Sequence, residues 1–324
     1  MKMFIQLFKK VGGREILRQY RQGHVLFFSF VITALLGFSK KSLEIVRLAV
    51  DNRKLCKLRK RCKSYITSYL DTHQEVKSCT RATKIWFLWL QGIENAPALV
   101  KSCYQSLQKN IPDREIILLT EYNYREFVKF PDYIQQKIDM GVITKTHMSD
   151  LLRLELLNRY GGTWIDATVY CSGNNIPEYM LDSDLFLFQS LKPGLDGKCT
   201  CISSWFITAC TNHPILLLTQ SLLYEYWKNN TKMFDYFLLH DFFQLAIEVY
   251  SEEWSKVIPF SNSAPHILLL RLFDVYDEKI WEAVKEMVPF HKLTYKFNEN
   301  MLNERNTYYN MIFVDEEMNH RIYK

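Results

Sequence analysis

Three charged residues within 149–171 (SDLLRLELLNRYGGTWIDATVYC) have types and spacing that suit a functional site. Asp150 and Arg153 are three residues apart on an expected helix, so they share one face. Asp166 falls within an apolar run, where a carboxylate needs a cation or several donors to offset its desolvation. The alternative is a plain helix-turn-strand with a surface ion pair. We interpret Asp166 as functional, with all three side chains near one pocket edge.

The elements that must position these residues follow an α/β pattern. Ser149 can cap the helix, and Gly161-Gly162 ends it and lets the backbone reverse into the next strand. Alternating strands and helices predict a parallel sheet, which places ligands at the carboxyl ends of its strands. We expect strands at 84–90, 114–119 and 163–170, helices at 97–108 and 150–160, and a helix-rich region after about residue 180.

Composition indicates a folded chain with an uneven charge distribution. With 48% hydrophobic and 15% aromatic residues, the 324-residue chain can bury a substantial core, which excludes wholesale disorder. Residues 1–63 carry sixteen Lys and Arg against three Asp and Glu, while the rest of the chain is net acidic. A basic arm of this kind suits an anionic surface, either a membrane or a nucleic acid.

The arm contains a 14-residue apolar run, Val25 to Phe38, which is shorter than the roughly 20 residues of a membrane span. It could form a core helix, an interfacial helix or a re-entrant hairpin. Basic residues on both sides favour an interfacial helix on anionic lipid. Nucleic acid is not expected as a partner, because the aromatic residues are clustered and not interleaved with the positive charges. The basic flanks are Arg14, Arg18 and Arg21 before the run, and 53–63 after it.

The eight cysteines are scattered along the chain. Only Cys199 and Cys201 are closely spaced, and no second pair completes a zinc site. Without a secretory signal, reduced thiols in the cytosol are expected. Cys171 and Cys210 have apolar surroundings and are interpreted as small buried hydrophobic residues.

The pattern Ser-Asp-x-x-Arg-x-x-x-Leu-x-x-x-Gly-Gly-x-Trp-x-Asp resembles the core of GT-A glycosyltransferases in the capsular polysaccharide synthesis protein family. Three other blocks are similar to that family, and the resemblance covers roughly residues 84 to 300. The blocks are KIWFLWLQG (84–92), IPDREIILLTEYN (111–123) and HKLTYK (291–296).

The resemblance implies a GT-A fold, with a Rossmann-like mixed sheet that is mostly parallel and flanked by helices. The expected organisation is a basic helical arm at 1–83 and a glycosyltransferase domain at 84–324. Within that domain, 84–180 would bind the nucleotide-sugar and 181–324, rich in helix, the acceptor.

The same resemblance implies roles for individual residues. Trp89 would stack on the nucleotide base, although a core tryptophan is the alternative. Asp150 would hold hydroxyls of the donor sugar, and Arg153 would pair with the sugar or the diphosphate. Lys296 would offer positive charge to the β-phosphate.

A divalent cation, Mn²⁺ or Mg²⁺, is also implied. Asp166 would be the first carboxylate of a DxD element that binds this cation, and His291 would supply a ligand from the far side, unless it is a structural histidine. The cation would neutralise charge on the departing nucleoside diphosphate. Thr168 replaces the second carboxylate, however, and a neutral hydroxyl binds such an ion more weakly, so metal dependence is open.

Other candidates have equally good structural explanations. Trp205 could contact the acceptor or belong to the core, and His240-Asp241 could orient an acceptor hydroxyl or form a buried pair. The aromatic run Tyr224, Tyr226 and Trp227 is more typical of core packing than of a sugar platform.

The expected function is transfer of a sugar from a nucleotide-sugar donor to an oligosaccharide acceptor in capsular or surface polysaccharide synthesis. The acceptor is expected to be lipid-linked. The expected location is the cytoplasmic face of the cell membrane, which would give the arm a purpose. Distant relatives, the Golgi α-mannosyltransferases and the clostridial glucosylating toxins, imply retention of configuration. The alternatives are a non-catalytic scaffold of a polysaccharide-assembly complex and a sugar-phosphate transferase.

Overall fold

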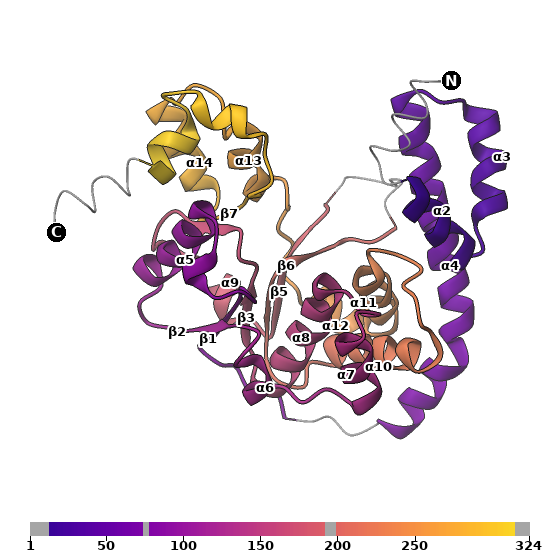
Figure 1. Ribbon diagram of the computed structural model, residues 1–324. Coiled ribbons are helices and arrows are strands. Elements are labelled where there is room, and N and C mark those ends of the chain that lie inside the picture. The colour runs from indigo at the N-terminus through magenta and orange to yellow at the C-terminus, as the bar shows by residue number, and fades with distance from the viewer. Residues whose placement is uncertain (1–12, 74–77, 192–198, 315–324) are drawn as a thin grey trace.

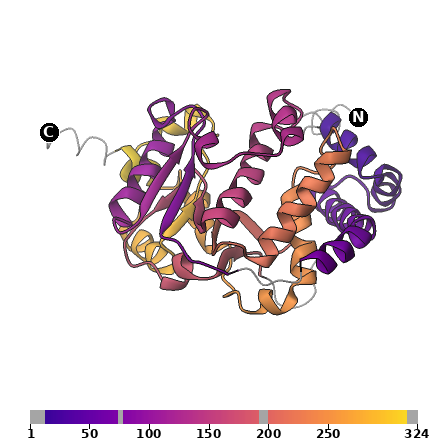
Figure 2. The same ribbon diagram turned by 90° about the horizontal axis from the view of Figure 1, so that it is seen from below.

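The computed structural model describes residues 13–73, 78–191 and 199–314 of the chain (Figure 1). A sheet with helices on both faces forms its centre. The amino-terminal helices form an upright arm at one side, and α13 and α14 lie at the other (Figure 1). Seen from below, α10 and α11, in orange, lie between the sheet and the arm (Figure 2).

The central sheet has five strands in the order β2-β1-β3-β6-β5. β1 (Lys84–Leu88) pairs in parallel with β2 (Glu115–Leu119) and with β3 (Gly162–Ile165). β6 (Ile202–Ala209) runs antiparallel to β3 and to β5 (Leu185–Gln189). Four strands therefore share one direction. The predicted mixed, mostly parallel sheet, flanked by helices, is confirmed.

Apolar side chains of the strands pack on both faces of this sheet. In β1, Trp86 belongs to one core cluster, while Ile85 and Phe87 belong to another on the opposite face. All three are fully buried. Such continuous apolar runs are typical of parallel strands that helices cover on both sides.

Two of the three covering helices match the helices expected at 97–108 and 150–160, and the short helix at 178–182 was not expected. One face packs against α5 (Ala98–Asn110) and α9 (Glu178–Asp182), and the other against α8 (Lys145–Tyr160). The remaining helices of 78–191 and 199–314 complete the layers. They are α6 (Tyr124–Phe127), α7 (Asp132–Asp139), α10 (Pro214–Asn229), α11 (Leu238–Val249), α12 (Ser251–Ser255), α13 (Ile267–Arg271) and α14 (Glu278–Met287), with single turns η1 (Ile93–Asn95), η2 (Ala264–His266), η3 (Glu299–Asn303) and η4 (Asn310–Val314).

The strand expected at 163–170 is interrupted. β3 ends at Ile165, and a turn follows in which the Val169 amide donates to the Asp166 carbonyl over 3.0 Å. The chain then enters β4 (Val169–Cys171), which pairs with the distant β7 (Phe290–Lys292) in a second, antiparallel sheet. Asp166 therefore lies just after the carboxyl end of β3 and not inside a strand.

The helix before β3 begins five residues earlier than expected. Thr144 caps α8, because its side chain accepts a hydrogen bond from the His147 amide over 3.2 Å. Ser149 lies inside the helix, where its hydroxyl donates to the Thr146 carbonyl over 2.6 Å. The expected Ser149 cap is therefore wrong, while the expected end of the helix at the Gly161-Gly162 pair is correct.

The arm consists of α2 (Gly13–Gln22), α3 (Leu26–Leu36) and α4 (Lys40–Thr72). α3 forms within the predicted apolar run. None of the described helices combines the length and the apolar character that crossing a bilayer requires. Leu55 and Leu58 of α4 belong to the same core cluster as α8 and α10. Packing therefore continues across the expected boundary at residue 83, which stays a prediction.

A disulfide between Cys79 and Cys210 joins the segment before β1 to the end of β6, with the two Cα atoms 5.5 Å apart. The expectation of reduced thiols is therefore wrong for this pair, because the scattered sequence positions gave no sign of their proximity. Cys171 is a buried free thiol, as expected, and burial raises its pKa to about 12.

The Gly161-Gly162 turn allows a test of whether the backbone at position 162 requires glycine. Gly162 has a φ of +96°, and an added Cβ would lie 2.3 Å from the Lys84 carbonyl oxygen. We expect Gly162→Ala to lower the free energy of unfolding by about 1–3 kcal/mol in denaturant titrations. Gly173→Ala is the matched control, because a Cβ there meets no heavy atom within 4 Å. Equal stability of the two variants would contradict this account.

Candidate active site

Asp166 is the centre of a cluster of charged side chains at the carboxyl end of β3. Its Oδ1 accepts a hydrogen bond from the Trp164 indole over 2.9 Å, and its Oδ2 accepts one from Lys292 Nζ over 2.9 Å. Arg153 Nη2 lies 3.7 Å from Oδ1. The carboxylate is thus held between two cations, yet 29% of the side chain stays exposed. The two cations offset the desolvation free energy of a carboxylate placed among apolar residues.

The same neighbours determine the protonation of Asp166. Burial alone would raise its pKa, but the positive charges of Lys292 and Arg153 outweigh burial, and the net effect lowers the pKa. Asp166 is therefore ionised at neutral pH. Because its pKa is lower in the folded state, this carboxylate stabilises the fold above its unfolded pKa, and the contribution is lost as the pH falls through the folded pKa.

Arg153 is buried and fixed from several directions, with 4% of its surface exposed. Its Nη1 donates to the Ser204 carbonyl, and its Nε donates to the Ser149 carbonyl over 3.2 Å. The guanidinium carbon lies 4.9 Å from the centre of the Trp164 ring. These contacts hold its charge beside Asp166, as the sequence predicts.

Asp150 completes the expected trio, and a residue that the sequence analysis missed orients it. Asp150 lies 3.2 Å from Arg153 Nη2 and 3.2 Å from His147 Nδ1. The Trp227 indole donates to His147 Nε2 over 2.9 Å, which leaves the proton of the neutral ring on Nδ1, facing Asp150. The local signal was present, because His147 precedes Asp150 by three residues on the same helix.

Lys292 is the second residue that the sequence analysis missed. Besides Asp166, its ammonium donates to Thr168 Oγ1 over 2.8 Å, and the Lys292 side chain is 18% exposed. Lys292 lies opposite Val169 in the β4–β7 pair, which brings it to this place from the far end of the chain. Lys292 belongs to the HKLTYK block, but the sequence analysis selected the adjacent His291 as the functional residue.

These contacts do not fit the divalent cation that the sequence led us to expect. The oxygens of Asp166 and Thr168 that would bind it both bind the Lys292 ammonium. A divalent cation bound to the same two oxygens would lie next to the Lys292 ammonium, which would repel it strongly. Thr168 also offers a hydroxyl where Mg²⁺ and Mn²⁺ prefer a carboxylate.

His291 lies on the other side of its strand. Its Nε2 bonds with Ser172 Oγ over 2.9 Å, and its ring contacts Tyr170 and Trp281. Successive side chains of a strand face opposite ways, so Lys292 faces Asp166 and His291 does not. The structure therefore places His291 in the core, and burial lowers its pKa to about 3. This position does not support the predicted metal ligand.

Trp89 directly follows β1 at the same edge of the sheet. Its ring meets that of Tyr295 edge to face, with centroids 5.5 Å apart. Lys296 Nζ lies 5.8 Å from the centre of the Tyr295 ring. The predicted base-stacking residue and the predicted phosphate-binding lysine thus both lie against Tyr295, which the sequence analysis did not single out.

Tyr236 is a further aromatic residue that the sequence analysis missed. Its side chain is 55% exposed, and its ring meets Phe237 edge to face. Partial burial, followed by the negative charges of Asp150 and Asp166, raises its pKa. An exposed aromatic ring beside the charged cluster can contact a sugar face.

The remaining candidates belong to the core. Trp205 is 7% exposed and stacks on Phe188 at 4.6 Å. Asp241 is buried, and its pKa lies well above the usual value because of burial. The run Tyr224, Tyr226 and Trp227 packs among helices, with hydroxyls bonded to Glu155 and to the Lys232 carbonyl.

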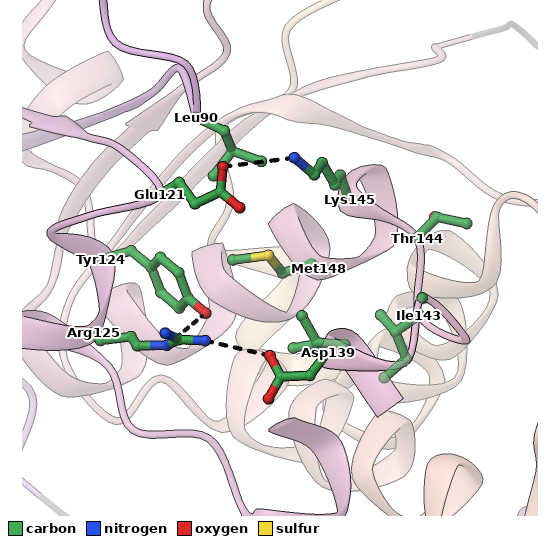
Figure 3. A pocket seen from close by; sticks show the side chains of 11 residues that line it. Leu90, Glu121, Tyr124, Arg125, Asp139, Ile143, Thr144, Lys145 and Met148 are labelled. Atoms are coloured by element: carbon green, nitrogen blue, oxygen red, sulfur yellow. Dashed lines mark hydrogen bonds and ion pairs between the residues drawn. The ribbon is translucent and has the colours of Figure 1, made fainter. Parts of the chain in front are cut away.

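A pocket of about 560 Å³ lies at the start of α8 (Figure 3). Leu90, the residue after Trp89, and Met148 of α8 are among the residues that line it. Its charged side chains are paired, Lys145 with Glu121 at 3.7 Å and Arg125 with Asp139 at 3.3 Å. The cluster around Asp166 lies outside this pocket.

Comparison with known proteins assigns the chain to a family. Residues 37–312 match the capsular polysaccharide synthesis protein family, which is most of the chain. The chain belongs to that family. The match begins just before α4, so the long arm helix lies within the region typical of capsular polysaccharide synthesis proteins, together with the central sheet and β7.

Individual relatives of this family member are distant. O-glycosyltransferase braB of Annulohypoxylon truncatum is 25% identical over 195 residues, which cover 55% of this chain and 44% of the relative. The match thus spans less than half of that protein. Two solved structures are similar: PaToxG glycosyltransferase (15% identity, 81% of this chain, 97% of that chain, TM-score 0.37) and a glycosyltransferase involved in glycosylation of the major capsid of PBCV-1 (9%, 67%, 95%, 0.33).

The buried His291 generates a pH prediction. Its folded pKa of about 3 is below the unfolded value of 6.5, so the unfolded chain takes up a proton first as the pH falls. Stability should therefore fall below about pH 6.5, by up to about 1.4 kcal/mol per pH unit from this residue. His291→Gln should flatten that slope in denaturant unfolding between about pH 7 and pH 5. An unchanged slope would show that His291 is not buried as described.

Proposed function

We propose that this chain is a glycosyltransferase that moves a sugar from a nucleotide-sugar donor to an oligosaccharide acceptor on a lipid carrier, in capsular or surface polysaccharide synthesis. The observation that carries the proposal is the cluster of Asp150, Arg153, Asp166 and Lys292 at the carboxyl edge of the parallel strands. Open α/β sheets bind ligands at this edge. Membership of the family and the similarity to an O-glycosyltransferase support the same activity.

Each part of the cluster suits one part of such a donor. Asp150, held by His147 and Arg153, offers carboxylate oxygens to sugar hydroxyls. Arg153 provides a fixed positive charge near the diphosphate, where negative charge grows as the sugar departs. Trp89 and Tyr295 offer aromatic faces to the base. We propose retention of configuration, on the resemblance alone, and the anomeric configuration of the product would test it.

Asp166→Asn tests the proposal. It keeps the shape of the side chain and removes the charge that fixes both cations, so we expect turnover to fall on the order of 10²–10³-fold. A panel of UDP- and GDP-sugars, screened by thermal stabilisation of the protein, would first identify the donor. Transfer to isolated lipid-linked oligosaccharides is then measured.

Asp184→Asn is the matched control, because Asp184 is an exposed carboxylate that pairs with Arg81. It should keep wild-type turnover. Wild-type turnover by Asp166→Asn would remove Asp166 from the mechanism.

A non-catalytic scaffold is the second candidate, and Thr168 in place of a second carboxylate favours it. A scaffold would show neither donor hydrolysis nor donor binding by calorimetry. A sugar-phosphate transferase would bind the same donors, but the mass of its product would include the phosphate.

We also propose that the arm attaches the protein to the cytoplasmic face of the cell membrane. α3 packs on α4 through a small cluster around Val25, Val46 and Val50. The outward side chains Phe27 and Phe30 are 81% and 71% exposed. Further exposed apolar side chains and lysines adjoin them, which suits an interfacial helix on anionic lipid. These are Leu35, Phe38, Lys40 and Lys41.

The membrane proposal is tested by flotation with anionic vesicles at low salt. The full-length protein should float with them. The double variant Phe27→Ser, Phe30→Ser should bind the vesicles about tenfold more weakly, because it loses two apolar anchors. Leu270→Ser is the control, since Leu270 is 79% exposed on α13, away from the arm. Failure of the wild type to float would end this proposal.

A further inference from the structure

The ammonium group of Lys292 lies where two oxygens of the Asp166-Ala167-Thr168 segment converge. It donates to Asp166 Oδ2 over 2.9 Å and to Thr168 Oγ1 over 2.8 Å. β7 fixes its backbone opposite Val169, directly after this segment. The positive charge is therefore part of the fold, and it is held by the residues that were expected to bind a divalent ion.

The ammonium also retains capacity for a ligand. Lysine has three N–H donors. Two are used by Asp166 and Thr168, and the third has no acceptor among the described residues. The side chain is 18% exposed, so this donor can be reached from outside. Arg153, by contrast, is 4% exposed and already bonds to the Ser204 and Ser149 carbonyls.

We propose that Lys292 is the built-in cation of the donor site, whose ammonium binds the β-phosphate of a nucleoside diphosphate and makes donor binding independent of Mg²⁺ and Mn²⁺. This inference rests on the proposed function. Thr168 is then explained, because a hydroxyl can accept a hydrogen bond from the ammonium without adding a negative charge. A second carboxylate would leave the site more negative and repel the phosphates.

In the reaction, the bond between the sugar C1 and the β-phosphate oxygen breaks, and its electron pair goes to that oxygen. The acceptor hydroxyl oxygen forms the new bond to C1, and its proton passes to the departing phosphate. Lys292 touches the group on which negative charge grows, so it stabilises the transition state more than the ground state. Lys296, four residues further along, lies with its ammonium 5.8 Å from the centre of the Tyr295 ring.

The decisive experiment is calorimetric titration of the full-length protein with UDP and with GDP, in excess EDTA and in excess MnCl₂. The wild type should bind one of them with affinities that agree within about twofold in the two buffers. Binding more than about tenfold tighter with Mn²⁺ would overturn the inference and leave the proposed function intact. Absence of binding in both buffers would instead contradict the proposed function.

Variants of Lys292 separate a ligand-binding lysine from a structural one. Lys292→Met keeps the length of the side chain and should weaken binding in EDTA by about tenfold to a hundredfold, while Lys292→Arg should restore part of it. Lys285→Met is the control, because Lys285 pairs with Glu282 on the surface of α14. Equal binding by wild type and Lys292→Met would also overturn the inference.

A double variant tests the idea in reverse. Thr168→Asp with Lys292→Ala removes the ammonium, leaves room for an ion and restores a second carboxylate. Free Mn²⁺, followed by electron paramagnetic resonance without nucleotide, should bind to the double variant and not to the wild type. Stoichiometric Mn²⁺ binding by the wild type, lost on Asp166→Asn, would show that a metal displaces the lysine and would refute the proposal.

Discussion

The structure of the site depends on one carboxylate that is shared by two cations. Asp166 cannot stay ionised among Trp164, Ile165 and Val169 unless positive charge is close on both sides, because desolvation opposes its charge. Arg153 comes from α8 and Lys292 from β7, so three separate elements must meet at the end of β3. The interaction therefore links the central sheet to the carboxyl-terminal part of the chain.

The sequence was sufficient for the parts of the site that are local. Asp150, Arg153 and Asp166 lie within seventeen residues, and helical spacing with a Gly-Gly turn places them together. The strands β1, β2 and β3 and the helices α5 and α8 followed from their apolar patterns, apart from the early start of α8 and the break after Ile165. Those differences arise because Thr144 supplies the cap and because β4 pairs with β7 and not with the central sheet.

The parts that could not be predicted depend on contacts across long stretches of chain. Lys292 and Thr168 are 124 positions apart, and only the register of β4 with β7 decides which of His291 and Lys292 faces Asp166. A shift of one residue would exchange them, since side chains alternate along a strand. The same holds for the disulfide, whose cysteines are 131 positions apart.

The arm helix α4 has a consequence for how this protein can be handled. Lys54 is 4% exposed and pairs with Asp51 and with the buried Asp235, whose carboxylate also accepts the Phe237 amide over 2.7 Å. The segment that presents Tyr236 to the charged cluster is thus anchored to the arm. A chain shortened to start at residue 84, to improve solubility, would lack Lys54. The buried carboxylate of Asp235 would then have no counter-ion, and the segment that carries Tyr236 would lose its contact with the arm. The amino-terminal helices thus help to hold in place the segment that carries Tyr236.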